Sequence, residues 1–301
     1  MKTKQHSRIC LAQNFLRSPK LVHWMVGLST IGSSDTVYEI GPGNGIITAA
    51  LASVARQVIA IEKDPELVRS LRERFRLLDN VQIVERDFLH YSFRTRPSTA
   101  APSLVIEEQT HTPEYKIFAS IPYNITAQIL RKILYERSNL SEGYLILQKE
   151  AAKKFSGLPR ETLVSILAKP FFEFQILYQL RRRDFWPVPN VDSVLLSIKR
   201  RTRPLIEMHD VDSYRDFVQY GFGRWKPNLK LAFKNVFTYR QWKRLAHDFD
   251  FQLSATPTEL SFEQWLGLYH GFRRDQGKGP HLPGPGAGRV SPPERCHRGR
   301  T

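Results

Sequence analysis

The sequence predicts an α/β fold in which a mostly parallel sheet with crossover helices ends in an antiparallel strand pair, followed by a small all-α domain. Three observations predict it. Short β-branched or aromatic runs alternate with helix-length segments over the first half of the chain, and two longer apolar runs follow them. From about Leu205 onward, apolar residues recur three and four positions apart, which is typical of helices.

Seven runs are expected to form the sheet. The first five are "TVYEI" (36–40), "QVIAIEKD" (57–64), "VQIVERDF" (81–88), "KIFASIP" (116–122) and "GYLILQK" (143–149). Because helix-length segments separate these runs, parallel strands joined by crossovers are expected. The antiparallel pair is "FFEFQILYQL" (171–180) and "SVLLSIKR" (193–200), joined by "RRRDFWPVPNVD".

The chain is expected to divide into an α/β domain over 1–203, a small helical domain over 204–274 and a tail over 275–301. The tail is basic and rich in Gly and Pro, so disorder is expected there. A second candidate for low order is the Ser/Thr/Pro-rich stretch 94–114. In the helical part, Ser261 and Gln264 stand three apart and are expected to form a capping box.

Composition indicates a folded protein with a polyanionic partner. Of 301 residues, 41% are hydrophobic, and 45 Lys and Arg against 29 Asp and Glu give a net charge of +16, which favours nucleic acid. No apolar stretch approaches the roughly 20 residues that span a bilayer, and no signal-peptide core follows the N-terminus, so a cytoplasmic location is expected. Cys10 and Cys296 lie at opposite ends and predict neither a disulfide framework nor a metal site.

A glycine-rich loop follows the first strand. Gly41, Gly43 and Gly45 in "VYEIGPGNGIITAALA" stand between a strand and a helix, where glycine allows a tight turn and close approach to a ligand. Their G-x-G-x-G spacing departs from the dinucleotide fingerprint, and the chain has no G-x-x-x-x-G-K phosphate loop. The loop predicts a nucleotide-like cofactor.

Carboxylates end the next two strands. Glu62 follows Gly45 by 17 residues, where an acid can accept hydrogen bonds from both ribose hydroxyls, and Asp87 could accept from an adenine amine. Each residue alone could be an ordinary turn glycine or surface carboxylate. Their order along successive strand ends favours an adenosine cofactor without phosphate, such as S-adenosylmethionine.

The fourth strand end, "SIPY", resembles the fourth motif of amino methyltransferases. The resemblance extends to ribosomal-RNA adenine N6-methyltransferases, whose motifs occur in the same order. They are "QNFL" (13–16), "EIGPGNG" (39–45), "IEKD" (61–64), "RDF" (86–88), "IPYNI" (121–125), "LQKEAA" (147–152) and "FWPVPNVDS" (185–193). "IPY" followed by "NIT" looks more like the Erm branch, which modifies 23S rRNA, than like the small-subunit rRNA dimethyltransferases.

This resemblance implies a Rossmann-like class I S-adenosylmethionine-dependent methyltransferase domain and an RNA-binding helical domain, in a monomer without metal. The implied cofactor residues are Asn14, Leu16, Gly41, Gly43, Gly45, Glu62, Lys63, Asp87, Phe88 and Ser120. The implied catalytic residues are Ser120, Ile121, Pro122, Tyr123 and Phe185.

The chemistry of an adenine amine supports these roles. The amine is a poor nucleophile, so a site must hold it in line with the activated methyl group and accept hydrogen bonds from its protons. Ser120 and the Ile121 carbonyl would do this, while Tyr123 and Phe185 would stack on the flipped base. Tyr123 could otherwise be a half-buried strand-end aromatic, and Phe185 could be an ordinary core residue.

Basic residues beyond the active site are candidate RNA contacts, although each could equally be a solvated surface charge. They are Arg131, Lys132, Lys149, Lys153, Arg182, Arg224 and Lys226.

Two alternatives to methylation of 23S rRNA with macrolide, lincosamide and streptogramin B resistance remain open. One is a small-subunit rRNA adenine dimethyltransferase, and the other is a methyltransferase-like RNA-binding factor without catalysis. Ser120 also replaces the Asn that is usual in rRNA enzymes, and its shorter side chain predicts monomethylation.

Overall fold

The computed structural model describes residues 14–93, 114–135, 139–223 and 226–275. Contacts divide the chain into two compact units, the first ending at Glu207 and the second beginning at Met208, where the sequence predicts a boundary after residue 203. The stretch 94–113 and the tail from 276 lie outside the described residues.

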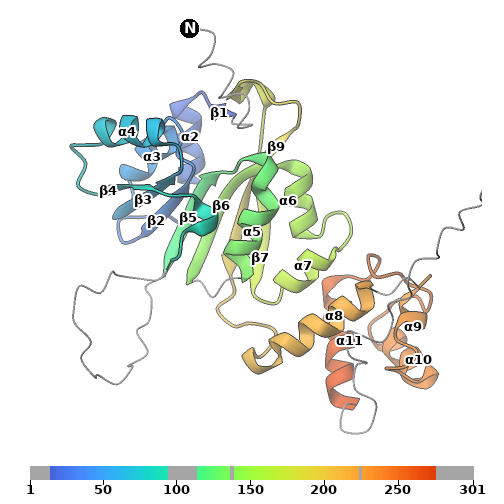
Figure 1. Ribbon diagram of the computed structural model, residues 1–301. Coiled ribbons are helices and arrows are strands. Elements are labelled where there is room, and N and C mark those ends of the chain that lie inside the picture. Colours follow the sequence, from blue (N-terminus) through green and yellow to red (C-terminus); the bar gives the residue numbers. More distant parts are fainter. Residues whose placement is uncertain (1–13, 94–113, 136–138, 224–225, 276–301) are drawn as a thin grey trace, which may run out of the picture. The chain divides into compact units, whose positions relative to one another are not determined.

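A seven-stranded sheet forms the centre of the first unit, with the strand order β4-β3-β2-β5-β6-β9-β7. β2 to β6 are parallel, and β9 runs antiparallel between β6 and β7 (Figure 1). The strands are β2 (Thr36–Ile40), β3 (Gln57–Glu62), β4 (Val81–Glu85), β5 (Tyr115–Ser120), β6 (Leu140–Gln148), β7 (Phe172–Leu180) and β9 (Ser193–Arg200). The expected α/β fold, with its antiparallel C-terminal pair, is confirmed.

Helices cover both faces of this sheet, so the strands read as continuous apolar runs. Figure 1 shows α5, α6 and α7 on one side and α2, α3 and α4 on the other. The helices are α2 (Pro19–Gly27), α3 (Ile46–Ala52), α4 (Pro65–Arg74), α5 (Thr126–Tyr135), α6 (Lys149–Ser156) and α7 (Leu163–Ala168). Short 3-10 turns follow β4, β5 and β7, at Phe88–His90, Tyr123–Ile125 and Arg182–Asp184.

A two-stranded ribbon that the sequence did not predict lies beside the main sheet. β1 (Phe15–Leu16) pairs antiparallel with β8 (Phe185–Trp186), with Phe15 opposite Trp186 and Leu16 opposite Phe185. The Arg17 amide also donates to the Asp184 carbonyl (3.0 Å). The ribbon joins "QNFL" to "FWPVP", which are far apart in the sequence, and strands of two residues are too short to show an alternating pattern.

The second unit is helical and packs around aromatic side chains. Its helices are α8 (Val211–Gly223), α9 (Leu229–Ala232), α10 (Tyr239–Asp248) and α11 (Phe262–Asp275), with a 3-10 turn at Met208–Asp210. Phe217 and Phe233 stack with ring centroids 4.8 Å apart, and Trp265 packs edge-on against both. The expected capping box is present, because the Ser261 amide donates to Gln264 Oε1 (2.8 Å) and the Gln264 amide donates to Ser261 Oγ (3.3 Å).

No helix in the described part of the chain is long and apolar enough to cross a membrane.

Candidate active site

The candidate site lies at the carboxyl ends of the parallel strands. From β2 the chain moves outward through β3 to β4 and then returns to place β5 on the other side of β2. The strand order therefore reverses between β2 and β5, which is where open α/β sheets bind their ligands.

The glycine loop turns at this point in a conformation that favours glycine. Gly41, Gly43 and Gly45 have φ angles of 65°, 58° and 78°, all in the left-handed region. A Cβ at Gly43 would lie 2.6 Å from Cε1 of Phe15, and one at Gly45 would lie 2.8 Å from Cδ2 of Leu71. Because Gly43 has no side chain, β1 can lie over the loop. For the same reason, Gly45 allows α4 to pack beside the start of α3.

Glu62 at the end of β3 is held by backbone amides. Its Oε1 accepts from Lys63 (2.8 Å) and Asp64 (3.1 Å), and its Oε2 accepts from Gly43 (3.3 Å). The side chain is buried. A carboxylate has about four acceptor positions, so about one remains for a ribose hydroxyl group.

A pocket of about 620 Å³, part of it open to solvent, lies between this carboxylate and α5. Asp87 and Phe88 line it, and Asp87 Oδ1 accepts from the Leu89 amide (2.9 Å). Its apolar walls suit an adenine ring and come from Ile40, Ile61, Phe88, Ile125 and Ile129. Lys63, Arg86 and Asn124 also line it, and the sequence analysis missed Arg86 and Asn124.

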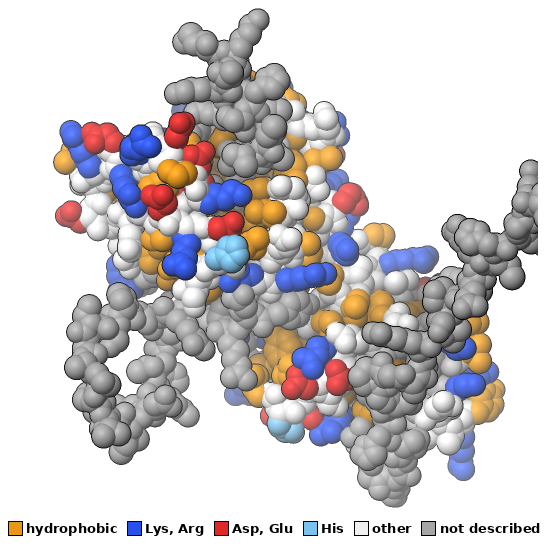
Figure 2. Space-filling model, viewed as in Figure 1, with side chains coloured by type: hydrophobic (Ala, Val, Ile, Leu, Met, Phe, Trp, Pro, Cys, Tyr) orange, Lys and Arg blue, Asp and Glu red, His pale blue; other side chains and the backbone are white. Residues whose placement is uncertain are grey.

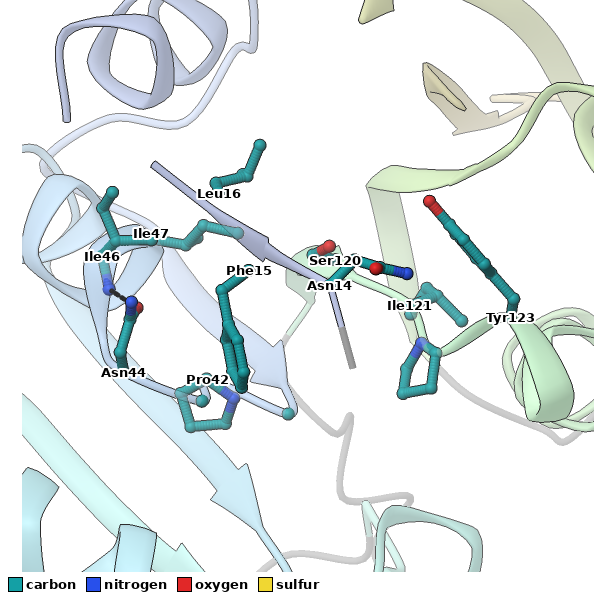
Figure 3. A pocket seen from close by; sticks show the side chains of 13 residues that line it. Asn14, Phe15, Leu16, Pro42, Asn44, Ile46, Ile47, Ser120, Ile121 and Tyr123 are labelled. Carbon is teal, nitrogen blue, oxygen red and sulfur yellow. Dashed lines mark hydrogen bonds between the residues drawn. The ribbon is translucent and has the colours of Figure 1, made fainter. Parts of the chain in front are cut away.

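A second pocket, of about 590 Å³, lies beside the end of β5. In Figure 3, Asn14 and Ser120 lie together between the glycine loop and Tyr123. Asn44 Oδ1 accepts from the Ile46 amide (3.2 Å) at the start of α3. The pocket is lined by Asn14, Phe15, Leu16, Gly41, Pro42, Gly43, Asn44, Ile46, Ile47, Ser120, Ile121, Pro122 and Tyr123.

Tyr123 is oriented by a hydrogen bond between its hydroxyl group and Ser193 Oγ (2.7 Å), at the start of β9. Burial raises the pKa of its phenol, and the bond to Ser193 lowers it in part. The phenol is therefore neutral near pH 7, and its ring is available as an aromatic face.

The structure brings most of the expected site residues to these two pockets, but two of them line neither. Gly45 caps α3, and Phe185 is only 1% exposed. Phe185 packs with Leu16, Leu180 and Leu195 in the core on the α2 and α3 side of the sheet. This placement agrees with the core-packing alternative for Phe185, because its side chain has no surface to offer a base.

The sequence analysis also missed Glu39, whose side chain is completely buried. Residues alternate along β2, so Glu39 faces α3, where Thr48 Oγ1 donates to its Oε2 (2.6 Å). Oε1 has no hydrogen-bond partner in the described part of the chain. Burial, which is the largest cause, and the charge of Glu62 raise the pKa of Glu39 to about 8. The hydrogen bond from Thr48 opposes this rise. A mid-strand acid in an apolar run was its only sequence signal.

The two pockets share Gly41 and Pro122, so they meet at the strand-order reversal. The residues present fit S-adenosylmethionine: apolar walls and Asp87 suit the base, Glu62 suits the ribose, and the glycine loop with Asn14 suits the methionine part. Within the described ranges no group of three His, Cys, Asp or Glu side chains could hold a metal ion.

The candidate RNA contacts lie in several places. Arg131 is exposed on α5, and Lys132 Nζ lies 5.9 Å from the Phe88 ring centroid. Figure 2 shows Lys and Arg side chains over the region of α5 and β4, while over α4 acidic and basic groups are mixed. Lys149 donates to Gln179 (3.1 Å), Lys153 pairs with Glu150 (3.0 Å) and Arg182 pairs with Asp192 (2.8 Å). Lys226 is exposed in the second unit, and Arg224 lies outside the described residues.

Comparisons with known proteins identify the family of the chain. Residues 4–272 match the family model described as ribosomal RNA adenine dimethylase. An rRNA adenine N-6-methyltransferase of Bacteroides fragilis is 29% identical over 258 residues, covering 85% of this chain and 90% of that protein. Ribosomal RNA small subunit methyltransferase A of Streptococcus equi subsp. zooepidemicus is 32% identical over 260 residues, covering 85% and 81%.

A solved structure is also similar. The crystal structure of the 23S rRNA methyltransferase ErmE has a TM-score of 0.74 and 29% identity, covering 86% of this chain and all of that one. The family model spans both compact units of the chain. The chain therefore belongs to the ribosomal RNA adenine dimethylase family, whose members are S-adenosylmethionine-dependent rRNA adenine N6-methyltransferases.

Proposed function

We propose that this protein transfers a methyl group from S-adenosylmethionine to the N6 amine of a specific adenine in 23S rRNA, and so confers macrolide, lincosamide and streptogramin B resistance. Its substrate is naked 23S rRNA or the assembling large subunit, and it acts as a monomer. The observation that carries the proposal is the likeness to ErmE through both units, together with Ser120, Pro122 and Tyr123 beside the cofactor pocket.

When bound, S-adenosylmethionine supplies an electrophilic methyl group on a sulfonium. The protein's own task is to hold the adenine amine, whose lone pair is delocalised into the ring. Ser120 Oγ and the Ile121 carbonyl accept hydrogen bonds from the N6 protons, which localises charge on the nitrogen. After transfer, the amine loses one proton to solvent.

Tyr123 offers its ring to the flipped adenine. The hydroxyl bond to Ser193 fixes the orientation of the ring, and the raised pKa of the phenol argues against a role as general base. A stacked base contributes roughly 1–3 kcal/mol, which offsets part of the cost of removing the adenine from its own stack.

Ser120 sets the product in this proposal. Its hydroxyl is shorter than the amide of the usual Asn, and no hydrogen bond to a described residue engages it. An amine held by so short an acceptor is displaced after the first methylation, because only one N6 proton remains to be bound. Monomethyladenine is therefore the expected product.

Methylation of the small subunit is the second candidate, because a small-subunit methyltransferase is 32% identical over 85% of this chain. Expression in a macrolide-sensitive strain, followed by mapping of N6-methylated adenines in both rRNAs, separates the two. A methylated 23S adenine with resistance supports the proposal. Methylation confined to small-subunit rRNA, without resistance, would establish the alternative.

A further inference from the structure

A large aromatic side chain is exposed beside the candidate site. Trp186 is 52% exposed, although it directly follows the buried Phe185. The β1–β8 ribbon explains the difference, because successive residues of a strand face opposite sides. Phe185 and its partner Leu16 face the core, so Trp186 and its partner Phe15 face away from it.

This register places Trp186 next to the acceptor pocket. Residues directly opposite in an antiparallel pair share a face, so the side chains of Trp186 and Phe15 project from the same face of the ribbon. Phe15 lines the pocket that contains Asn14 and Ser120, and its ring lies over Gly43. The exposed indole of Trp186 and the pocket-lining ring of Phe15 therefore come from paired residues on one face of the ribbon.

The surroundings of Trp186 are apolar close by and basic further out. Val188 and Val191 are 57% and 38% exposed. The exposed cations that flank this loop in the chain or through the ribbon are Arg17, Arg181, Arg182 and Arg183. The loop's own acids are engaged, because Asp192 pairs with Arg182 (2.8 Å) and Asp184 Oδ2 accepts from the Arg181 amide (2.8 Å).

A flat aromatic ring among arginines fits a nucleic-acid strand better than a protein surface or an acidic small molecule. We propose that Trp186 is a stacking site for the unpaired base adjacent to the target adenine, with the neighbouring arginines contacting its phosphates. This inference rests on the proposed RNA methylation. Flipping the target adenine deprives its neighbour of a stacking partner, and the indole replaces that partner.

Steady-state methylation of an rRNA hairpin spanning the mapped adenine, at saturating S-adenosylmethionine, tests the proposal with Trp186→Ala and Trp186→Phe. Loss of one base stack predicts a rise of about tenfold in KM for RNA with Trp186→Ala, while Trp186→Phe stays within about threefold. Trp24→Ala is the matched control. Trp24 is 49% exposed, lies on α2 and lines neither pocket, so no change in KM is expected.

Abasic substitution of each nucleotide flanking the target identifies the stacked base. In the wild-type protein, one abasic position should raise KM for the hairpin about tenfold. In Trp186→Ala, the same abasic position should cause no further rise in KM. Thermal unfolding followed by circular dichroism checks that Trp186→Ala is folded.

Three results would overturn the inference. Trp186→Ala could show the wild-type KM, or the abasic penalty could persist undiminished in that variant, in either case while the wild-type protein methylates the hairpin. A wild-type protein that methylates no rRNA would overturn the proposed function together with this inference.

Discussion

The two pockets of the candidate site differ in how their polar groups are held. We call the pocket with Glu62 and Asp87 the cofactor side, and the pocket with Ser120 and Tyr123 the acceptor side. On the cofactor side, the Glu62 carboxylate accepts hydrogen bonds from three backbone amides, and the Asp87 carboxylate accepts one from a fourth. On the acceptor side, no bond to a described residue engages the Ser120 hydroxyl, and Tyr123 is held only at its tip. The same cofactor is bound in every turnover, so its site gains from fixed donors and acceptors, whereas the acceptor side must admit and release a large RNA.

The largest expected effect is a loss of cofactor affinity when a polar group on the cofactor side is changed. Glu62→Gln replaces one acceptor oxygen by a donor and weakens the hydrogen bond to the ribose, worth about 1.5–3 kcal/mol. Affinity for S-adenosylmethionine should fall on the order of 100-fold, measured by isothermal titration calorimetry. Glu73→Gln, at an exposed surface ion pair, is the control and should bind normally. Unaltered affinity in Glu62→Gln would remove Glu62 from the cofactor site.

Glu39 is a second buried carboxyl group near the glycine loop. The pKa of Glu39 is about 8 in the folded protein against 4.5 as the ordinary value, so between these pH values only the folded state keeps the proton. Stability from this group therefore falls as pH rises through that window. Glu39→Gln should flatten the decline and be more stable than wild type by up to about 3 kcal/mol at pH 7.

Denaturant unfolding of both proteins at a series of pH values measures this difference. At pH 4 the two should have nearly the same free energy of unfolding, because Glu39 is protonated when folded and mostly protonated when unfolded. Parallel pH profiles for the two proteins would contradict the raised pKa of Glu39.

On the acceptor side, two substitutions of Tyr123 distinguish the contribution of ring stacking from that of the hydroxyl hydrogen bond. Tyr123→Ala removes the ring and should lower kcat/KM for RNA about tenfold or more, since a stack is worth roughly 1–3 kcal/mol. Tyr123→Phe keeps the ring and loses only the bond to Ser193, so a decrease of about threefold is expected. Equal losses in both variants would mean that the hydroxyl, not the ring, supports methylation.

The smallest change in rate, but a change of product, is expected from Ser120→Asn. The longer amide supplies an acceptor that can retain a monomethylated amine, so the ratio of dimethyl- to monomethyladenine should rise. Mass spectrometry of the modified rRNA fragment measures the ratio. Predominantly dimethyladenine from the wild-type protein would show that Ser120 does not limit the product.

The order of strands and helices, the glycine loop and the two carboxylates at strand ends can be predicted from the amino-acid sequence, because each depends on local periodicity or on a position next to a strand. In a parallel sheet, the carboxyl ends of strands share one edge, so Glu62, Asp87 and Ser120 could be placed together without coordinates. The capping box of Ser261 is local in the same sense.

Which side chains of the distant motifs face the pocket depends on tertiary contacts and could not be predicted from local patterns. "QNFL" and "FWPVP" pair in a ribbon two residues long, which buries Phe185, places Phe15 on the glycine loop and exposes Trp186. Glu39 Oε1, which has no partner among the described residues, is likewise buried because α3 covers β2. Burial and cross-strand register depend on contacts between segments far apart in sequence, and local patterns carry no record of them.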